Sequence, residues 1–219
     1  GLVQRPIPLP DGSSLKLTVS RYFTPSGRFI QKPYEDGENY DRDLIDRYNR
    51  GEMIHADSIH FPDSLKTQTL IKHRSIYGGG GIMPDIFVPF DTTSITPLHR
   101  VLSASGILNR FSLEHVDANR KELIKTYADP DAFIAEFTVN DELIETLMTY
   151  ATKDDVSFTQ ADSLSDKTLL KKQLKAYMAR DLWKSADFYR VMWTENEALL
   201  KALEFLNEPK KYAQKFEKD

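Results

Sequence analysis

RYFTPSGRFIQ, residues 21–31, is the stretch around which the fold of this chain is organised. Within it, Pro25 fixes its own backbone and Gly27 accepts a conformation that other residues avoid, which predicts a turn. Ser26 lies between them, but no histidine or lysine stands in a recognisable pattern that would activate it as a nucleophile. We therefore predict that Ser26 is part of the turn.

Alternating side chains before this turn predict a β-hairpin. Apolar and polar residues alternate over 15–20, and residues 3–9 carry apolar side chains on one side. Three prolines in the first strand cannot donate ladder hydrogen bonds, so this strand must lie at a sheet edge or leave the sheet early. Asp11-Gly12-Ser13-Ser14 supplies the turn between the strands. The hairpin would complete a sheet begun upstream.

Two further stretches are GLVQ at residues 1–4 and GIMPDIFVP at residues 81–89. In this order, the three stretches resemble the C-terminal processing peptidases, also called tail-specific proteases, which are serine peptidases with a Ser/Lys active site. The resemblance implies that the catalytic lysine immediately precedes Gly1 and that the nucleophilic serine lies further upstream. The expected chain is a C-terminal fragment of a serine endopeptidase acting on protein or peptide substrates, and is inactive alone.

Gln4 is the one member of the family's catalytic set that the resemblance identifies in this chain, with the role of orienting the missing lysine. A lysine that takes the serine proton must be neutral, and burial favours this by lowering its pKa. A glutamine carbonyl can accept a hydrogen bond from that amine without restoring its charge. Four residues of spacing on an extended strand put both side chains on one face. The alternative interpretation is a polar side chain on an edge strand.

The resemblance also implies that the turn lies near the active site and supports the strand that carries Gln4. The supporting residues are Tyr22, Thr24, Pro25, Ser26 and Gly27. It further implies acyl-enzyme chemistry without a cofactor, and a location in the periplasm or cell envelope.

Composition narrows the function classes. The chain has 219 residues, a net charge of −4 and no cysteine, so disulfides and thiolate metal sites are excluded. The charge gives no reason to expect nucleic acid or an anionic membrane as a partner. No apolar run approaches the roughly twenty residues that span a bilayer. His55 and His60 have no suitably spaced carboxylate nearby, so we expect no metal site.

The first predicted domain covers residues 1–92, as the C-terminal part of a peptidase core. It contains an insertion at about 32–80, with a short helix at 43–51 that ends at a glycine and a turn at 63–70 that leads into an extended segment. The insertion either shapes substrate access or packs on the core. The four glycines at 78–81 lack the lysine of a P-loop and are interpreted as a flexible link.

Residues 93–219 are predicted to form a helical domain, which makes the whole chain α+β. Five helix starts are indicated by a capping oxygen or a proline, at Thr96-Pro97, Asp129-Pro130, Thr138-x-x-Asp141, Ser163-x-x-Asp166 and Thr194-x-x-Glu197. Apolar stripes follow these starts, and we interpret all of them as core. They are Leu143, Ile144, Leu147, Met148 and Ala151; Leu169, Leu170, Leu174, Tyr177 and Met178; the aromatics Trp183, Phe188, Tyr189 and Trp193; and Leu199, Leu200, Leu203 and Phe205. A frayed, charged tail is expected at 210–219.

A competing hypothesis belongs to a different class of protein. The helical domain would be a non-catalytic interaction module, or part of a pseudoprotease, that docks an adaptor lipoprotein, a partner subunit or another copy of itself. The presence or loss of the upstream serine and lysine separates the two hypotheses.

Overall fold

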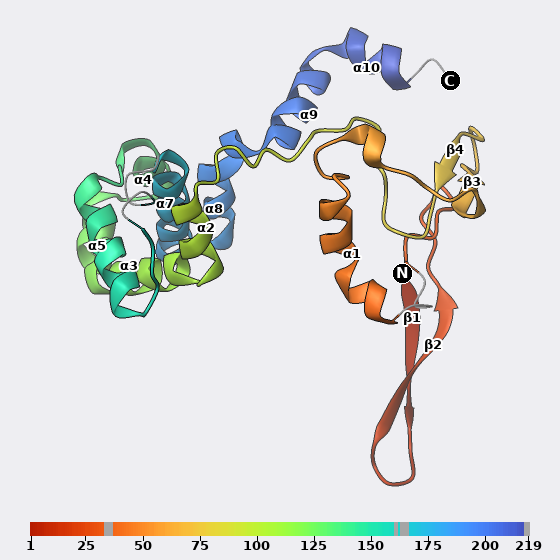
Figure 1. The fold of residues 1–219 in the computed structure, drawn as a ribbon, viewed down its shortest axis with the longest axis horizontal. Coiled ribbons are helices and arrows are strands. Elements are labelled where there is room, and N and C mark those ends of the chain that lie inside the picture. The colour runs from red at the N-terminus through yellow and green to blue at the C-terminus, as the bar shows by residue number, and fades with distance from the viewer. Residues whose placement is uncertain (33–36, 160–161, 163–166, 217–219) are drawn as a thin grey trace. The chain divides into compact units, whose positions relative to one another are not determined.

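The structure is a computed structural model, and it describes residues 1–32, 37–159, 162 and 167–216. Over these residues the chain is α+β, with two small antiparallel sheets followed by a helical region (Figure 1), and the predicted fold class is confirmed. The chain divides into two compact units, Gly1–Phe90 together with Tyr212–Asp219, and Asp91–Lys211. Each unit is described by itself.

The predicted hairpin is present at the start of the first unit. Strand β1, Leu2–Pro8, pairs antiparallel with β2, Ser14–Arg21. The turn is closed by a hydrogen bond from the Leu9 N–H to the Ser13 carbonyl at 2.9 Å. The Asp11 carboxylate accepts from the Ser13 hydroxyl at 2.6 Å and from the Ser13 N–H at 3.0 Å, and these bonds lower the pKa of Asp11.

A β-bulge interrupts the hairpin beside Gln4. Val3 lies opposite Ser20, whereas Gln4 lies opposite Thr18, so Val19 is the extra residue in β2. Because the extra residue is in β2, the side chains of β1 keep their alternation between the two faces. Gln4 therefore shares a face with Thr18, its cross-strand partner.

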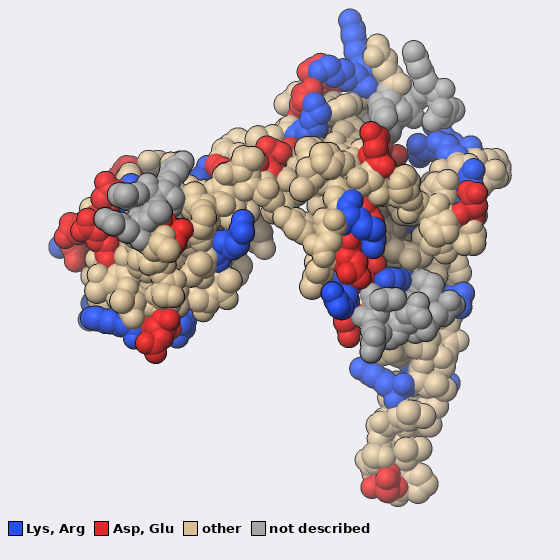
Figure 2. Space-filling model, viewed as in Figure 1, with Lys and Arg blue, Asp and Glu red and all other residues tan. Residues whose placement is uncertain are grey.

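The other face of the hairpin carries most of its bulky apolar side chains, together with Arg5, and is largely uncovered. Its bulky residues are 38–54% exposed, and they are Val3, Ile7, Leu15, Leu17 and Val19. Figure 2 shows that most of the hairpin surface in that view carries neither acidic nor basic side chains, with an acidic residue near its tip. A two-stranded hairpin is at best marginally stable in water, so an apolar face of this kind is suited to covering by further structure.

The expected insertion contains one long helix and a second small hairpin. Helix α1, Gly37–Asn49, begins earlier than predicted and is followed by Gly51 with a φ of +79°, which confirms the glycine stop. Two 3₁₀ turns, η1 at Ala56–Ser58 and η2 at Asp63–Leu65, lead into β3, Lys66–Gln68. Strand β3 pairs antiparallel with β4, Ser75–Tyr77, so the extended segment expected after residue 63 is confirmed.

The glycines at 78–81 form a defined junction, which differs from the flexible link expected. The Gly79 N–H donates to the Phe29 carbonyl at 2.8 Å, and the Gly81 N–H donates to the Ile30 carbonyl at 2.9 Å. A Cβ added at Gly78 would lie only 2.7 Å from the Phe29 carbonyl oxygen. Glycine is thus required because the two backbones approach closely.

This junction gives the first testable prediction. Gly78→Ala should destabilise the first unit by about 2 kcal/mol, because the new methyl group meets backbone that cannot move aside freely. Gly80→Ala is the matched control, since nothing lies within 4 Å of a Cβ added there. Urea unfolding, with amide exchange at Gly79 and Gly81 as a local probe, measures both. Equal stability of the two variants would contradict the close-approach explanation.

The second unit is helical. Its elements are α2 (Pro97–Ala104), α3 (Ile107–Thr126), α4 (Pro130–Glu136), α5 (Asp141–Lys153), α7 (Thr168–Leu182), α8 (Ser185–Met192), the 3₁₀ turn η3 (Trp193–Glu195) and α9 (Glu197–Asn207). The last helix, α10 (Pro209–Phe216), begins in this unit and runs into the C-terminal segment of the first. The frayed tail expected from residue 210 is therefore wrong as far as Phe216.

Side-chain caps explain which helix starts were predictable. Thr96 caps α2 and Asp129 caps α4, each by accepting a backbone N–H, as expected. At the starts expected at Thr138 and Thr194, the capping residue is instead an asparagine two positions later. Asn140 caps α5 and Asn196 caps α9. The start expected at Ser163 lies outside the described residues.

Two helices of the second unit were not predicted. Helices α3 and α8 begin without a side-chain cap, so the sequence carries no capping signal at either start. Gly106 precedes α3 with a φ of +73°, which ends α2 and allows a new helix direction at once. The described part of this unit consequently contains more helices than the five expected.

The core of the second unit forms where the predicted stripes meet. Ile144, Leu147 and Ala151 of α5 are buried, as are Leu170, Leu174 and Met178 of α7, which confirms both stripes as core. Trp183 and Phe188 are partly buried against them. The largest fully buried side chain is Phe133 of α4, which stacks on Phe137 with ring centroids 4.5 Å apart.

The last predicted core segments are exposed. No residue of α9 is buried; Leu199 and Leu200 are each 40% exposed and Leu203 is 38% exposed. Tyr189 and Trp193 are also exposed, at 71% and 45%. Core positions were predicted from apolar periodicity alone, but α9 packs chiefly against the short η3, so its apolar side lacks a cover among the described residues.

One partly buried histidine is expected to make the second unit sensitive to pH. His115 of α3 is half-buried beside Phe111, with ring centroids 5.7 Å apart, and this burial lowers the pKa of its imidazole. The unfolded chain then binds a proton more readily than the folded one. Stability should therefore fall as pH drops through the ordinary histidine value of about 6.5, and level off below the folded pKa.

His115→Asn should flatten that fall. The measurement is the urea midpoint of the helical signal at a series of pH values from about 7.5 to about 5, for the natural chain and the variant. An exposed lysine-to-glutamine change, Lys121→Gln on the same helix, controls for a general effect of charge. An unchanged decline in His115→Asn would assign the pH sensitivity to another group.

Candidate functional site

Gln4 lies in β1 with its side chain exposed. Within the described residues, its carboxamide makes no hydrogen bond to another side chain or to the backbone. Alternation places it on the same face as Thr18 and Lys16, away from the apolar side chains of the hairpin. The carboxamide is thus available to a group that this part of the chain does not contain.

The predicted turn leaves the hairpin at the end where Gln4 lies. Tyr22, directly after β2, faces Gly1: its N–H donates to the Gly1 carbonyl at 2.7 Å, and its side chain is 69% exposed. The segment at 24–27 follows at once. The structure therefore brings the first residues of the chain and this segment to one end of the same small sheet.

The turn itself has the form that its residues predict. The Gly27 N–H donates to the Thr24 carbonyl at 2.8 Å, with Pro25 and Ser26 at the two central positions. Gly27 has a φ of +85°, which is the unusual conformation expected of it. The hydroxyls of Thr24 and Ser26 share a hydrogen bond of 2.9 Å, so Ser26 is engaged within the turn.

A cavity of about 630 Å³ lies beside this turn in the first unit. Its lining includes Ser26 and Arg28, then Thr69 and residues 72–76 around the β3–β4 connection, and Asp85. His73 is among the lining residues, but no hydrogen bond joins it to Ser26 in the described part of the chain. The pairing therefore gives no evidence of a serine nucleophile activated by histidine.

Sequence reasoning missed most of this cavity. Arg28 belongs to the opening stretch and Asp85 to residues 81–89, yet neither was assigned a role. The one available signal was the consecutive basic run Lys72-His73-Arg74 inside the insertion. Its meaning depended on a contact between distant segments, which the sequence does not reveal.

No group of three or more histidine, aspartate and glutamate side chains is arranged in the described residues to hold a metal ion. No described helix combines the length and the apolar character required to cross a membrane.

The hairpin and the turn can now be compared with known proteins. Residues 1–38 match the model of peptidase family S41. This segment contains Gln4, both strands of the hairpin and the turn at 24–27, so the proposed site residues all lie in the peptidase-related part of the chain. Peptidases are hydrolases, and the match relates this segment to that class.

Most of the helical unit matches a different family. Residues 98–184 match a family of unknown function (DUF8443), whose model spans α2 to α7 and ends after Trp183. No curated protein and no solved structure matches the chain. The S41 match covers 38 of the 219 residues, and the two matches fall on separate parts of the chain.

Proposed function

We propose that this chain supplies the part of a serine endopeptidase core that follows the catalytic lysine. The observation that carries the proposal is the peptidase S41 match over residues 1–38, which covers the strand with Gln4 and the turn with Tyr22 and Thr24–Gly27. The serine and the lysine belong to sequence upstream of Gly1. The substrates are proteins or peptides, the location is the periplasm or cell envelope, and the reaction uses no cofactor.

In this function, Gln4 acts on the lysine and not on the substrate. The neutral lysine amine takes the proton of the serine hydroxyl while the serine oxygen attacks the scissile carbonyl carbon. The amine then gives a proton to the leaving nitrogen as the peptide bond breaks and an acyl-enzyme forms. Water attacks the ester in a second round of the same proton transfers. The Gln4 carbonyl accepts a hydrogen bond from the amine and holds it toward the serine.

Two features of the hairpin support this assignment. The Gln4 carboxamide has no partner among the described residues, as a residue awaiting the lysine requires. The apolar face of the hairpin, with residues 38–54% exposed, is suited to packing within a larger peptidase core. The chain alone, without the catalytic serine and the catalytic lysine, is inactive.

The deciding experiment is cleavage of an unfolded protein substrate. The protein expressed with its upstream coding sequence should cleave, its variant lacking the serine hydroxyl should not, and the 219-residue chain should not. Absence of cleavage by the longer protein would overturn the proposal. Cleavage by the 219-residue chain alone would show that the catalytic groups lie within it and would overturn the role given to Gln4.

A second candidate function is favoured by the exposed leucines of α9. An amphipathic helix whose apolar side is 38–40% exposed at three leucines suits an interaction module that self-associates or docks an adaptor lipoprotein. Light scattering of the 219-residue chain and of Leu199→Glu/Leu203→Glu tests self-association. A monomer at all concentrations before substitution would exclude it.

A further inference from the structure

The basic cavity of the first unit is assembled from three segments that are distant in the sequence. The turn supplies Arg28, the β3–β4 connection supplies Lys72 and Arg74, and the segment after the glycine junction supplies Asp85. The turn and the connection are in contact, because a Cβ added at Gly27 would lie 3.2 Å from the Leu70 side chain. The cavity is therefore formed where the insertion meets the peptidase-related segment.

The guanidinium of Arg28 is fixed by a hydrogen bond at its Nε. Its Nε donates to the Tyr77 carbonyl at 3.0 Å, and its backbone N–H donates to the Thr24 hydroxyl at 3.1 Å. No acidic side chain in the described part of the chain pairs with it. The terminal N–H groups of Arg28 are thus pre-oriented and available to a ligand, which lowers the entropy lost on binding.

The connection at 69–74 is a closed loop and not a loose tip. The Thr69 N–H donates to the Arg74 carbonyl at 2.9 Å, and the Thr69 hydroxyl accepts from the Arg74 N–H at 3.0 Å. His73 completes the loop with a φ of +52°. This backbone fixes where the side chains of Lys72 and Arg74 begin.

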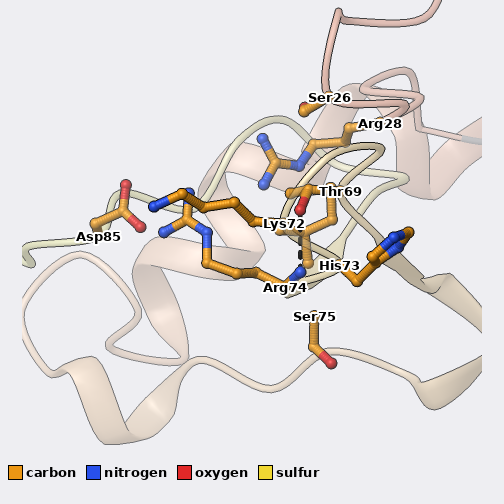
Figure 3. Close-up of a pocket in the computed structure, with 9 residues that line it drawn as sticks. Ser26, Arg28, Thr69, Lys72, His73, Arg74, Ser75 and Asp85 are labelled. Atoms are coloured by element: carbon orange, nitrogen blue, oxygen red, sulfur yellow. Dashed lines mark hydrogen bonds between the residues drawn. The ribbon is translucent and has the colours of Figure 1, made fainter. Parts of the chain in front are cut away.

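The three cationic groups converge. Figure 3 shows the guanidinium groups of Arg28 and Arg74 and the amine of Lys72 in one region, with Asp85 beside it, while the imidazole of His73 points away. Neither Arg74 nor Asp85 forms an ion pair with another described residue. Two arginines that form no ion pair with a described residue thus lie in one hollow of a chain whose net charge is −4. Clustering of one sign in a hollow concentrates the field and attracts the opposite charge.

We propose that this cavity binds a carboxylate of a peptide, through Arg28 and Arg74. The planar fork of arginine matches a carboxylate with two parallel hydrogen bonds. A volume of about 630 Å³ exceeds a single carboxylate and accommodates neighbouring peptide atoms, for which Asp85 offers a hydrogen-bond acceptor. The inference deepens the proposed peptidase function and rests on it. The carboxylate belongs to an acidic side chain or to a peptide C-terminus.

Calorimetric titration of the folded 219-residue chain tests the proposal without requiring cleavage. One peptide carries a glutamate and a free C-terminus, a second is the same peptide amidated at its C-terminus, and a third has glutamine in place of glutamate. Loss of binding in the second identifies the C-terminal carboxylate, and loss in the third identifies the side chain. A fourth peptide carries both changes and so lacks both carboxylates. If it binds as tightly as the first peptide, the proposal is overturned.

Two variants and a control locate the site. Arg28→Gln and Arg74→Gln should each weaken binding about tenfold or more, because each removes a charge-assisted hydrogen bond. Arg74→Gln removes no hydrogen bond that holds the fold, so it stays informative if Arg28→Gln unfolds. Arg42→Gln in α1 removes the same charge outside the cavity and should bind normally. If peptide binding is weakened equally in all three variants, the loss reflects the lower net charge of the chain, and the proposed site is overturned.

The outcome for this site is separable from that for the peptidase. Cleavage by the longer protein, with unchanged peptide binding in the arginine variants, would reject the cavity and leave the proposed function intact. Carboxylate-dependent binding that needs Arg74, in a protein that never cleaves, would support the site and reject the peptidase function. Binding of inorganic phosphate without binding of any of the peptides would reject the peptide ligand.

Discussion

Gln4→Ala is expected to lower turnover about a hundredfold in the longer protein that carries the serine and lysine, which is the lower end of what a positioned proton-transfer group contributes. The variant removes the carbonyl that, in the proposed function, orients the lysine amine. Gln4 is exposed on a two-stranded sheet, so its truncation removes no buried volume and should leave the fold unchanged. The expected signature is a fall in kcat with little change in KM, because the lysine and not the substrate loses a contact.

Two further substitutions make this result specific. Gln4→Glu should also impair turnover and should shift the pH optimum upward, because a carboxylate favours the charged lysine and raises its pKa. Lys16→Gln lies on the same face of the hairpin, opposite Pro6, and should retain normal turnover. Single-turnover kinetics over a range of pH measures all three. Full activity of Gln4→Ala would remove the role assigned to Gln4.

Phe133→Ala is expected to destabilise the second unit by about 3–5 kcal/mol, the usual result of emptying a buried aromatic site. Phe133 is 0% exposed and lies at the centre of an aromatic group. Its ring is 4.5 Å from that of Phe137, 5.3 Å from that of Tyr127 and 5.4 Å from that of Trp183. Removal of the ring takes one aromatic contact from each of the three partners and opens a cavity.

Tyr189→Ala is the matched control for this loss. Tyr189 is also aromatic and belongs to the same unit, but it is 71% exposed, so its truncation should cost less than about 1 kcal/mol. Urea unfolding followed by far-ultraviolet circular dichroism reports mainly on this helical unit and gives the free energy for each variant. Similar losses in both variants would show that burial does not determine the stability of this unit.

Local signals in the sequence predicted those parts of the fold that local interactions determine. The Asp11-Gly12 turn and the caps Thr96 and Asp129 need only neighbouring residues, and each is found as expected. Helices α3 and α8 begin without such caps and depend on packing, so they escaped prediction. The burial of α9 failed for a related reason, because periodicity identifies an apolar side but not what covers it.

The residues of the candidate site also fall into those that a local stretch of sequence predicts and those that only folding brings together. Gln4 and Thr24–Gly27 could be predicted as site residues because they lie in a continuous stretch that resembles a known family, and the S41 match covers the same residues. The cavity needed Arg28, Arg74 and Asp85 to meet through chain folding. The glycine junction at 78–81 was misread for this reason too, since its close approach to Phe29 exists only in the folded chain.

The bulge at Val19 affects which register the two strands of the hairpin can adopt. In a regular antiparallel pair, one strand can slip along the other by a residue and still satisfy its backbone hydrogen bonds, with every side chain moved to the wrong face. The extra residue at Val19 removes that freedom, because the two halves of β2 match β1 in a single alignment. A slipped hairpin would turn Gln4 toward the apolar side. The bulge therefore favours the single alignment that keeps Gln4 on the opposite side of the hairpin from Leu15 and Leu17.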